Sequence, residues 1–114
     1  MLKWVAIERE EQVEAIAALS HSRPCVVYKH STRCSLSSLA KYRLEKEWDL
    51  AEDAVAIFYV DIIAHRHLSR YLSERFEVHH ESPQVLLIRD GECTYDASHL
   101  DISIADLRSA GLES

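Results

Sequence analysis

The stretch that decides the fold is residues 25–37, which read Cys-Val-Val-Tyr-Lys-His-Ser-Thr-Arg-Cys-Ser-Leu-Ser. Its first five residues are rich in β-branched and aromatic side chains and predict a short buried strand. From about Ser35 to Trp48, apolar residues recur at helical spacing and predict a helix. Cys34 therefore stands where the chain turns from strand into helix, and Ser37 follows three positions later.

A cysteine at such a junction is favoured as a nucleophile. The unpaired N–H groups at a helix start and the positive end of the helix dipole stabilise a thiolate relative to a thiol. Many lone cysteines are simply small packing residues, but the neighbours of Cys34 are polar, which favours a reactive thiol. Arg33 and Lys29 bring positive charge nearby. His30 either pairs with the thiolate or caps local backbone.

Ser37 occupies the place where a dithiol oxidoreductase carries its second, resolving cysteine. It is either an ordinary residue of the first helical turn or a hydrogen-bond partner of the Cys34 sulfur. The sequence therefore predicts a redox protein with one reactive thiol.

The remaining segments alternate between helical and extended patterns. Helices are predicted at 10–20 and 64–76 and from Ser103 onward, and strands at 55–62, 84–89 and 92–97, with a further short strand at 3–7 compatible with the pattern. Asp90-Gly91 separates the last two strands and predicts a tight hairpin. Two crossovers and a hairpin give an α/β architecture with a central mixed sheet of four to five strands and helices on both faces. This succession describes a thioredoxin-like fold, and we expect residues 1–114 to form a single domain.

Pro83 lies just before the predicted strand at 84–89, where thioredoxin-like folds carry a cis-proline loop that faces the active-site cysteine. We therefore expect a cis Ser82–Pro83 bond, although most X–Pro bonds in folded proteins are trans. Because proline has no N–H, the backbone of Ser82 is free to pair with an incoming extended peptide or thiol compound.

The other two cysteines are poorly placed to resolve a disulfide on Cys34. Cys25 opens the strand whose far end leads to Cys34, so roughly 16 Å separate the two ends of that strand. A disulfide needs Cα atoms within about 7 Å. Cys93 lies just past the hairpin turn, where its expected cross-strand partner is Ile88. We expect both thiols to pack as small apolar groups, so a mixed disulfide on Cys34 must be resolved by a thiol from solution.

Composition argues against several classes of function. Thirteen basic and nineteen acidic side chains give a net charge of −6, which disfavours nucleic acid and anionic membranes as partners. No apolar run approaches the roughly 20 residues of a membrane span, and the first residues do not resemble a signal peptide. We therefore expect a cytoplasmic protein with reduced cysteines. The histidines at 65, 67, 79 and 80 lack a recognised ligand spacing, so no metal site is expected.

Two motifs resemble the bacillithiol-system redox-active proteins, also called monothiol bacilliredoxins. Residues 28–37 read Tyr-Lys-His-Ser-Thr-Arg-Cys-Ser-Leu-Ser, and residues 80–84 read His-Glu-Ser-Pro-Gln. The resemblance runs the length of the chain. It implies a bacterial, cytoplasmic role in thiol homeostasis and stress response, with bacillithiol as co-substrate and no bound cofactor. Members often carry proline or another small residue after the cysteine; Ser35 stands there in this chain.

On this interpretation the Cys34 thiolate attacks a mixed disulfide between a client protein and bacillithiol and takes the adduct onto itself. A second bacillithiol, or a bacillithiol-linked reductase, then frees Cys34. Lys29 and Arg33 are expected to hold the carboxylates of the malate part of bacillithiol. The expected site comprises catalytic Cys34, Ser37 and Pro83 and substrate-binding Lys29, His30, Arg33 and Ser82.

Two other functions remain open at this point. One is a monothiol glutaredoxin-like protein that uses glutathione or holds an iron–sulfur cluster, although the Cys-Gly-Phe-Ser stretch and the Gly-Gly pair usual in that class are not found in the sequence. The other is a non-enzymatic thioredoxin-like interaction module in which Cys34 is only a site of modification.

Overall fold

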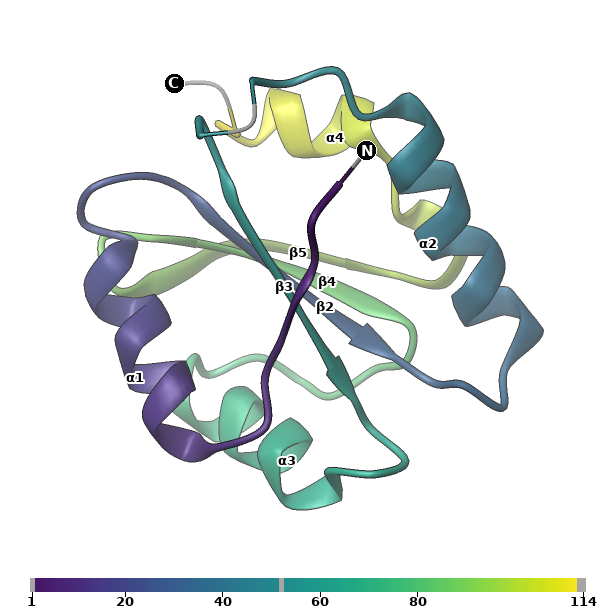
Figure 1. Ribbon diagram of the computed structural model, residues 1–114, viewed down its shortest axis with the longest axis horizontal. Helices are drawn as coiled ribbons and strands as arrows, with labels where there is room; N and C mark the ends of the chain where they lie inside the picture. Colours follow the sequence, from purple (N-terminus) through teal and green to yellow (C-terminus); the bar gives the residue numbers. More distant parts are fainter. Residues whose placement is uncertain (1, 52, 113–114) are drawn as a thin grey trace.

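Strands and helices alternate along the chain in the predicted order (Figure 1). The computed structural model describes residues 2–51 and 53–112. The elements are β1 (Val5–Ala6), α1 (Glu10–Leu19), β2 (Cys25–His30), α2 (Ser35–Glu47), β3 (Ala56–Asp61), α3 (Arg66–Arg75), β4 (Gln84–Arg89), β5 (Glu92–Ser98), the 3₁₀ turn η1 (His99–Asp101) and α4 (Ile104–Ser109). The sequence pattern does not predict η1, and α3 begins two residues later than the pattern suggests.

The five strands form one mixed sheet in the order β1-β3-β2-β4-β5. β1 and β2 run parallel to β3, whereas β4 is antiparallel to β2 and β5 is antiparallel to β4. This arrangement confirms the predicted mixed sheet. None of the described helices is long and apolar enough to cross a membrane.

Helices cover both faces of the sheet, and the central strand β2 contributes to both cores. Figure 1 shows α1 and α3 on one face and α2 and α4 on the other. Since successive side chains of a strand point to opposite faces, Val27 joins the core beneath α1 and α3, while Val26 and Tyr28 join the core beneath α2 and α4. Burying each such aliphatic side chain stabilises the fold by about 1.5–3 kcal/mol.

The β4–β5 hairpin turns at Asp90-Gly91, as predicted. Both residues have positive φ angles, 53° and 80°, which a type I′ hairpin turn requires. Ser20 at the end of α1 holds this turn: its carbonyl accepts the Asp90 N–H at 2.9 Å and its hydroxyl accepts the Gly91 N–H at 2.8 Å. Ile88 is paired with Cys93 across the hairpin, also as predicted.

The strand directions bring four connections to one edge of the sheet. Parallel β2 and β3 end at this edge, antiparallel β4 begins there, and β5 ends there. The segments after β2 and β3, the segment before β4, and η1 therefore lie close together. In open α/β sheets this is the edge at which ligands bind.

Candidate active site

Cys34 is the N-terminal cap residue of α2, with extended backbone angles of φ −116° and ψ 114°. Its carbonyl accepts the N–H groups of Ser37 at 3.1 Å and Ser38 at 3.3 Å, and its own N–H donates to the Ser31 carbonyl at 3.2 Å. The thiol makes no capping hydrogen bond and is half-buried, and Arg33 beside it is exposed. The sulfur therefore lies at the helix start with partial access to solvent.

Ser37 is wholly buried, and its hydroxyl holds the turn that leads into Cys34. The Oγ atom accepts the Ser31 N–H at 3.0 Å and lies 2.7 Å from His30 Nδ1. Burial, helped by Lys41, holds the pKa of His30 below its ordinary value, so the ring is neutral at pH 7. The described contacts of this hydroxyl thus go to the turn and not to the Cys34 sulfur.

Tyr28 also supports this turn, a role that the sequence pattern does not predict. Its hydroxyl donates to the Ser37 carbonyl at 2.6 Å, and its ring centroid lies 6.0 Å from that of Trp4 and 5.9 Å from that of His30. Burial raises the pKa of Tyr28 to about 12, so the hydroxyl stays a donor. Strand alternation was the available signal, because residues 28 and 30 must share the face that α2 covers.

The Ser82–Pro83 peptide bond is cis. Gln84 is paired with Lys29 across β4 and β2, which places Pro83 next to the end of β2. The Pro83 carbonyl accepts the His99 N–H at 3.0 Å, which ties η1 to this loop. The fold thus brings Ser82 and Pro83 to the same edge as His30, Arg33, Cys34 and Ser37.

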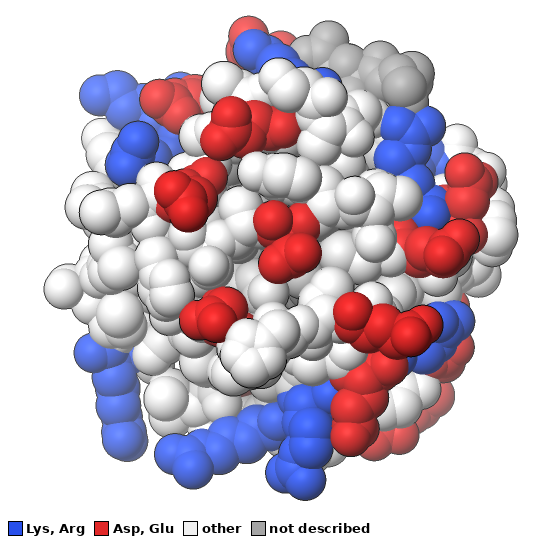
Figure 2. Space-filling view, turned by 180° about the vertical axis from the view of Figure 1, so that it is seen from behind, with Lys and Arg blue, Asp and Glu red and all other residues white. Residues whose placement is uncertain are grey.

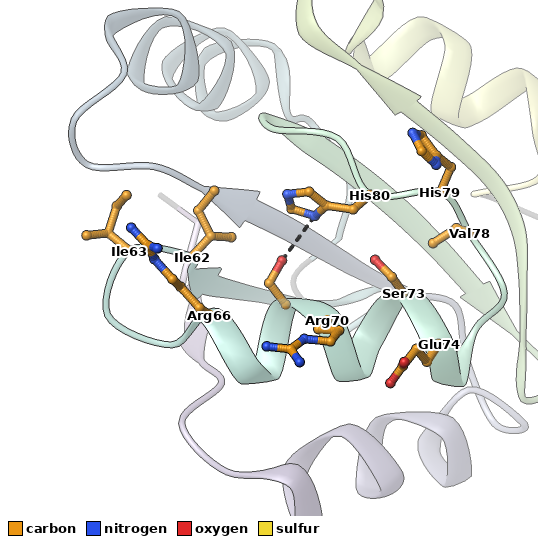
Figure 3. Close-up of a pocket in the computed structure, with 10 residues that line it drawn as sticks. Ile62, Ile63, Arg66, Arg70, Ser73, Glu74, Val78, His79 and His80 are labelled. Carbon is orange, nitrogen blue, oxygen red and sulfur yellow. Dashed lines mark hydrogen bonds between the residues drawn. The ribbon is translucent and has the colours of Figure 1, made fainter.

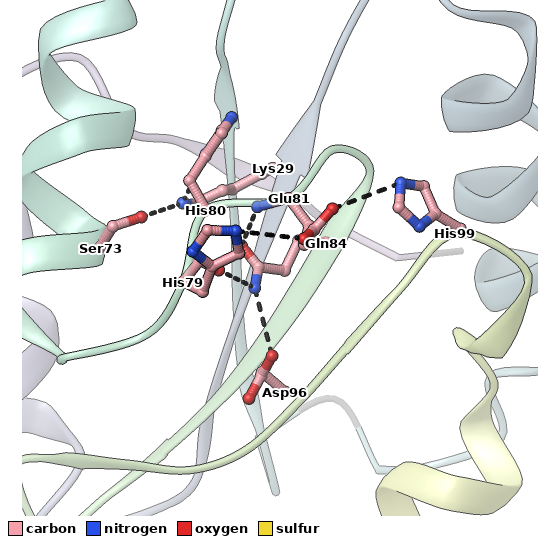
Figure 4. A network of polar contacts seen from close by, with 8 residues as sticks. All are labelled: Lys29, Ser73, His79, His80, Glu81, Gln84, Asp96 and His99. Carbon is pink, nitrogen blue, oxygen red and sulfur yellow. Dashed lines mark hydrogen bonds and ion pairs between the residues drawn. The ribbon is translucent and has the colours of Figure 1, made fainter.

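Lys29 lies on the opposite face of the sheet, beneath α3. It is wholly buried, and its ammonium donates to Ser73 Oγ at 2.6 Å and approaches His80 Nδ1 to 3.1 Å (Figure 4). Burial lowers the pKa of Lys29 to about 8. The structure therefore does not bring the Lys29 ammonium to the α2 side of the site with His30 and Ser37.

Buried Gln84 holds the segment before Pro83. Its Nε2 donates to the His79 carbonyl at 2.9 Å and to Asp96 Oδ2 at 3.2 Å, while its Oε1 accepts the Glu81 N–H at 3.2 Å (Figure 4). The Glu81 carboxylate lies 3.5 Å from His79 Nε2 and 3.7 Å from His99 Nε2. These contacts fix the backbone on both sides of residue 80.

A cavity of about 600 Å³ lies between α3 and this segment (Figure 3). Its lining residues are Ile62, Ile63, Arg66, Ser69, Arg70, Ser73, Glu74, Val78, His79 and His80. These residues all belong to the stretch 62–80, but no sequence pattern predicts a cavity, because the space depends on how α3 and the segments on either side of it pack against the sheet. Within residues 2–51 and 53–112, no three His, Cys, Asp or Glu side chains form a group that could hold a metal ion.

The remaining thiols are far from Cys34 and from each other. Cys25 and Cys93 both pair with Ile88, from β2 and β5 respectively, so two strand spacings, about 10 Å, separate them. A disulfide cannot bridge that distance. Burial raises the pKa of each thiol to about 11, which keeps both protonated.

Charge is unevenly distributed over the surface. On the face seen in Figure 2, acidic side chains scatter over the centre and gather at the lower right, while basic side chains lie at the upper left and upper right and along the lower edge. That edge is the end of the molecule at which α3 lies in Figure 1. The lining of the cavity beside α3 carries two arginines, Arg66 and Arg70, and one acidic residue, Glu74.

Comparison with known proteins places these features in a family. Residues 5–107 match the family model described as monothiol bacilliredoxin BrxC. A solved thioredoxin-fold structure to which an oxidoreductase function has been ascribed is 28% identical, with a TM-score of 0.79 over 93% of this chain and 91% of that one.

Two thioredoxins share the fold at lower identity. Thioredoxin Mala s 13 of Malassezia sympodialis is 14% identical, with a TM-score of 0.74 over 96% of this chain and 89% of that one. Thioredoxin f of spinach chloroplast is also 14% identical, with a TM-score of 0.70 over 95% and 89% of the two chains. The fold is therefore that of thioredoxin.

Proposed function

Because the chain belongs to the monothiol bacilliredoxin family, we propose that Cys34 removes bacillithiol from protein mixed disulfides. Family and fold already assign the protein a thiol redox role. The proposal adds the substrate, the reacting atom and the route of resolution. We further propose a cytoplasmic, bacterial setting in a stress response, with bacillithiolated client proteins and a bacillithiol-linked reductase as partners and with no bound cofactor.

The observation that carries the proposal is the position of Cys34. Cys34 is the N-terminal cap residue of α2 and its thiol is half-buried, so the sulfur stands at the positive end of the helix dipole with partial access to solvent. Cys25 and Cys93 lie elsewhere in the sheet and remain protonated. A disulfide on Cys34 therefore has no partner inside the described chain.

The proposed thiol–disulfide exchange has two steps. In the first, the Cys34 thiolate attacks the bacillithiol sulfur of the mixed disulfide; a new S–S bond forms on Cys34, and the client leaves as a thiolate that takes up a proton. In the second, the thiolate of another bacillithiol attacks the adduct, so that bacillithiol disulfide forms and the Cys34 thiolate returns. The turn built on Ser37, and the loop at Pro83, position the sulfur and the client backbone.

Cys34→Ala tests the proposal with a bacillithiolated client protein. Mass spectrometry is expected to show removal of the adduct by the wild type and none by the variant. Cys93→Ala is the matched control, because it also removes a thiol but from the far part of the sheet, and it is expected to act like the wild type. Adduct removal that persists in Cys34→Ala would exclude this mechanism.

A further inference from the structure

The cavity beside α3 has the size and position of a ligand site. Its volume of about 600 Å³ falls within the roughly 300–1,000 Å³ typical of small-molecule sites. Ile62, on one wall, donates its N–H to the His30 carbonyl at 2.9 Å, so this wall adjoins the end of β2 that leads to Cys34. The opposite wall, residues 78–80, leads into the loop of Ser82.

The His80 ring presents an N–H group to this cavity. An ammonium can only donate hydrogen bonds, so the approach of Lys29 Nζ to Nδ1 at 3.1 Å requires Nδ1 to be an acceptor. Burial and the Lys29 charge both hold the pKa of His80 below its ordinary value, so the ring is neutral and carries its hydrogen on Nε2. Figure 3 shows the ring projecting across the cavity toward Ile62.

Two guanidinium groups stand beside the same cavity. Arg66 and Arg70 lie one helical turn apart on α3 and are exposed. Among the described residues neither has an ion-pair partner, whereas Arg75 on the same helix is paired with Glu14 at 2.9 Å. Guanidinium groups bind carboxylates through two parallel hydrogen bonds. Glu74 is the one acidic residue in the lining.

These groups together match a ligand with carboxylates on a small carbon skeleton. Arg66, Arg70 and the His80 N–H supply donors for negative oxygen atoms, and Ile62, Ile63 and Val78 supply an apolar wall. Neither a cationic nor a wholly apolar ligand would satisfy the two unpaired guanidinium groups.

We propose that this cavity holds the malate carboxylates of bacillithiol on Arg66, Arg70 and the Nε2–H of His80 while the bacillithiol sulfur lies at Cys34. The proposal rests on the function proposed above and deepens it, because it assigns the part of the site that recognises the thiol compound. Lys29 is a positioning residue in this arrangement: it acts through the His80 ring and does not touch the ligand.

Selectivity between two disulfides tests the site. One model peptide is prepared as its mixed disulfide with bacillithiol and as its mixed disulfide with 2-mercaptoethanol, which has no carboxylate. The ratio of the two exchange rate constants is measured for the wild type and for the double variant Arg66→Gln, Arg70→Gln. We expect the variant's ratio to fall about tenfold or more, since each lost charge-assisted contact removes binding to the anionic compound only. Arg43→Gln, an exposed change on α2, is expected to keep the wild-type ratio.

The outcomes separate the two proposals. A wild-type protein that does not remove bacillithiol contradicts the proposed function itself. A wild-type protein that removes it, with the same ratio in the double variant, overturns the cavity assignment and leaves the function standing. Nitrogen-15 shifts of the His80 ring give an independent readout: hydrogen on Nε2 supports the proposal, and hydrogen on Nδ1 contradicts it.

Discussion

The two sides of β2 use consecutive residues for different tasks. Toward α2, Tyr28 and His30 form a neutral hydrogen-bond network with Ser37. Its described hydrogen bonds all join groups of the protein. Toward α3, Lys29 forms a charged network with Ser73 and His80 at the wall of a cavity. The first network holds a turn in place, and the second orients a donor toward open space.

One strand can thus support both the turn that carries Cys34 and the wall of the proposed ligand cavity. Strand alternation sends odd and even positions to opposite faces, so neighbours in sequence enter separate environments. The α2 side is expected to respond to mutation through the stability of the turn. The α3 side is expected to respond through charge, and therefore through pH.

Among substitutions in these two networks, Ser37→Ala is expected to lower the free energy of unfolding most, because it removes the hydroxyl at the centre of the network beneath α2. The change leaves the buried Ser31 N–H without its acceptor and removes the partner of His30. An unsatisfied buried donor costs about 1–3 kcal/mol, and we expect a loss of that size in the free energy of unfolding measured with urea. Ser38→Ala, one residue on and exposed, is the control and should change it by less than about 0.5 kcal/mol. Equal effects of the two substitutions would show that the turn does not depend on Ser37.

Lys29→Met tests whether the network beneath α3 makes stability depend on pH. The pKa of Lys29 is about 8 in the folded protein against an ordinary value of 10.5, so between these values the unfolded chain holds the extra proton. The contribution of Lys29 to stability then rises with pH in that window, by about 1 kcal/mol from pH 8 to pH 9. Urea unfolding is expected to show the free energy of unfolding of the wild type rising by about this amount relative to that of Lys29→Met, because the opposing ionisation of unfolded Cys25 and Cys93 is common to both chains.

The control for this pH dependence is Lys46→Met, which removes an exposed lysine from α2 and should keep the wild-type slope. Cys25 and Cys93 hold their protons to about 11 in the folded protein but ionise near 9 when unfolded, within the same window and in both chains. That ionisation lowers stability as pH rises. The same slope in Lys29→Met and the wild type between pH 7.5 and pH 9 would assign the titration to other groups.

Tyr28→Phe is expected to have the smallest effect of the three. It removes the hydrogen bond to the Ser37 carbonyl but keeps the ring that packs near Trp4. Because that carbonyl still accepts a bond within α2, the expected loss of unfolding free energy is about 0.5–1 kcal/mol. Tyr42→Phe, on the exposed side of α2, should be neutral. A Tyr28→Phe variant as stable as Tyr42→Phe would mean that the ring alone supports the turn.

Several elements could be predicted because their signals are local. The strand-to-helix junction at Cys34, the hairpin at Asp90-Gly91 and the start of α4 at Ser103 each depend on a few adjacent residues. The cis Ser82–Pro83 bond was expected from its place in the order of elements. The unpredicted turn η1 lacks such a signal, since it depends on the tie between His99 and the Pro83 carbonyl.

The partners of the site residues could not be predicted in the same way. The sequence predicts Lys29 beside a ligand at Cys34. In the structure its ammonium contacts Ser73 and His80, which lie 44 and 51 residues later in the chain. His80 belongs to the motif at residues 80–84, but no sequence pattern predicts that its ring contacts Lys29. Which polar groups meet depends on how α3 packs on the sheet. The spacing of residues in the sequence does not show which residues so far apart in the chain come into contact.

By itself, the sequence determined the order of strands and helices, the one thiol placed at a helix start, and the thioredoxin fold, because periodicity and turn chemistry act over a few residues. Only the tertiary structure decided that Ser37 holds a turn, that Lys29 is buried beneath α3, and that Arg66, Arg70 and His80 surround one cavity. Lys29 meets partners from a distant segment, whereas Ser37 and the cavity residues meet near neighbours in the chain; in each case the contacts form only when the helices pack on the two faces of the sheet.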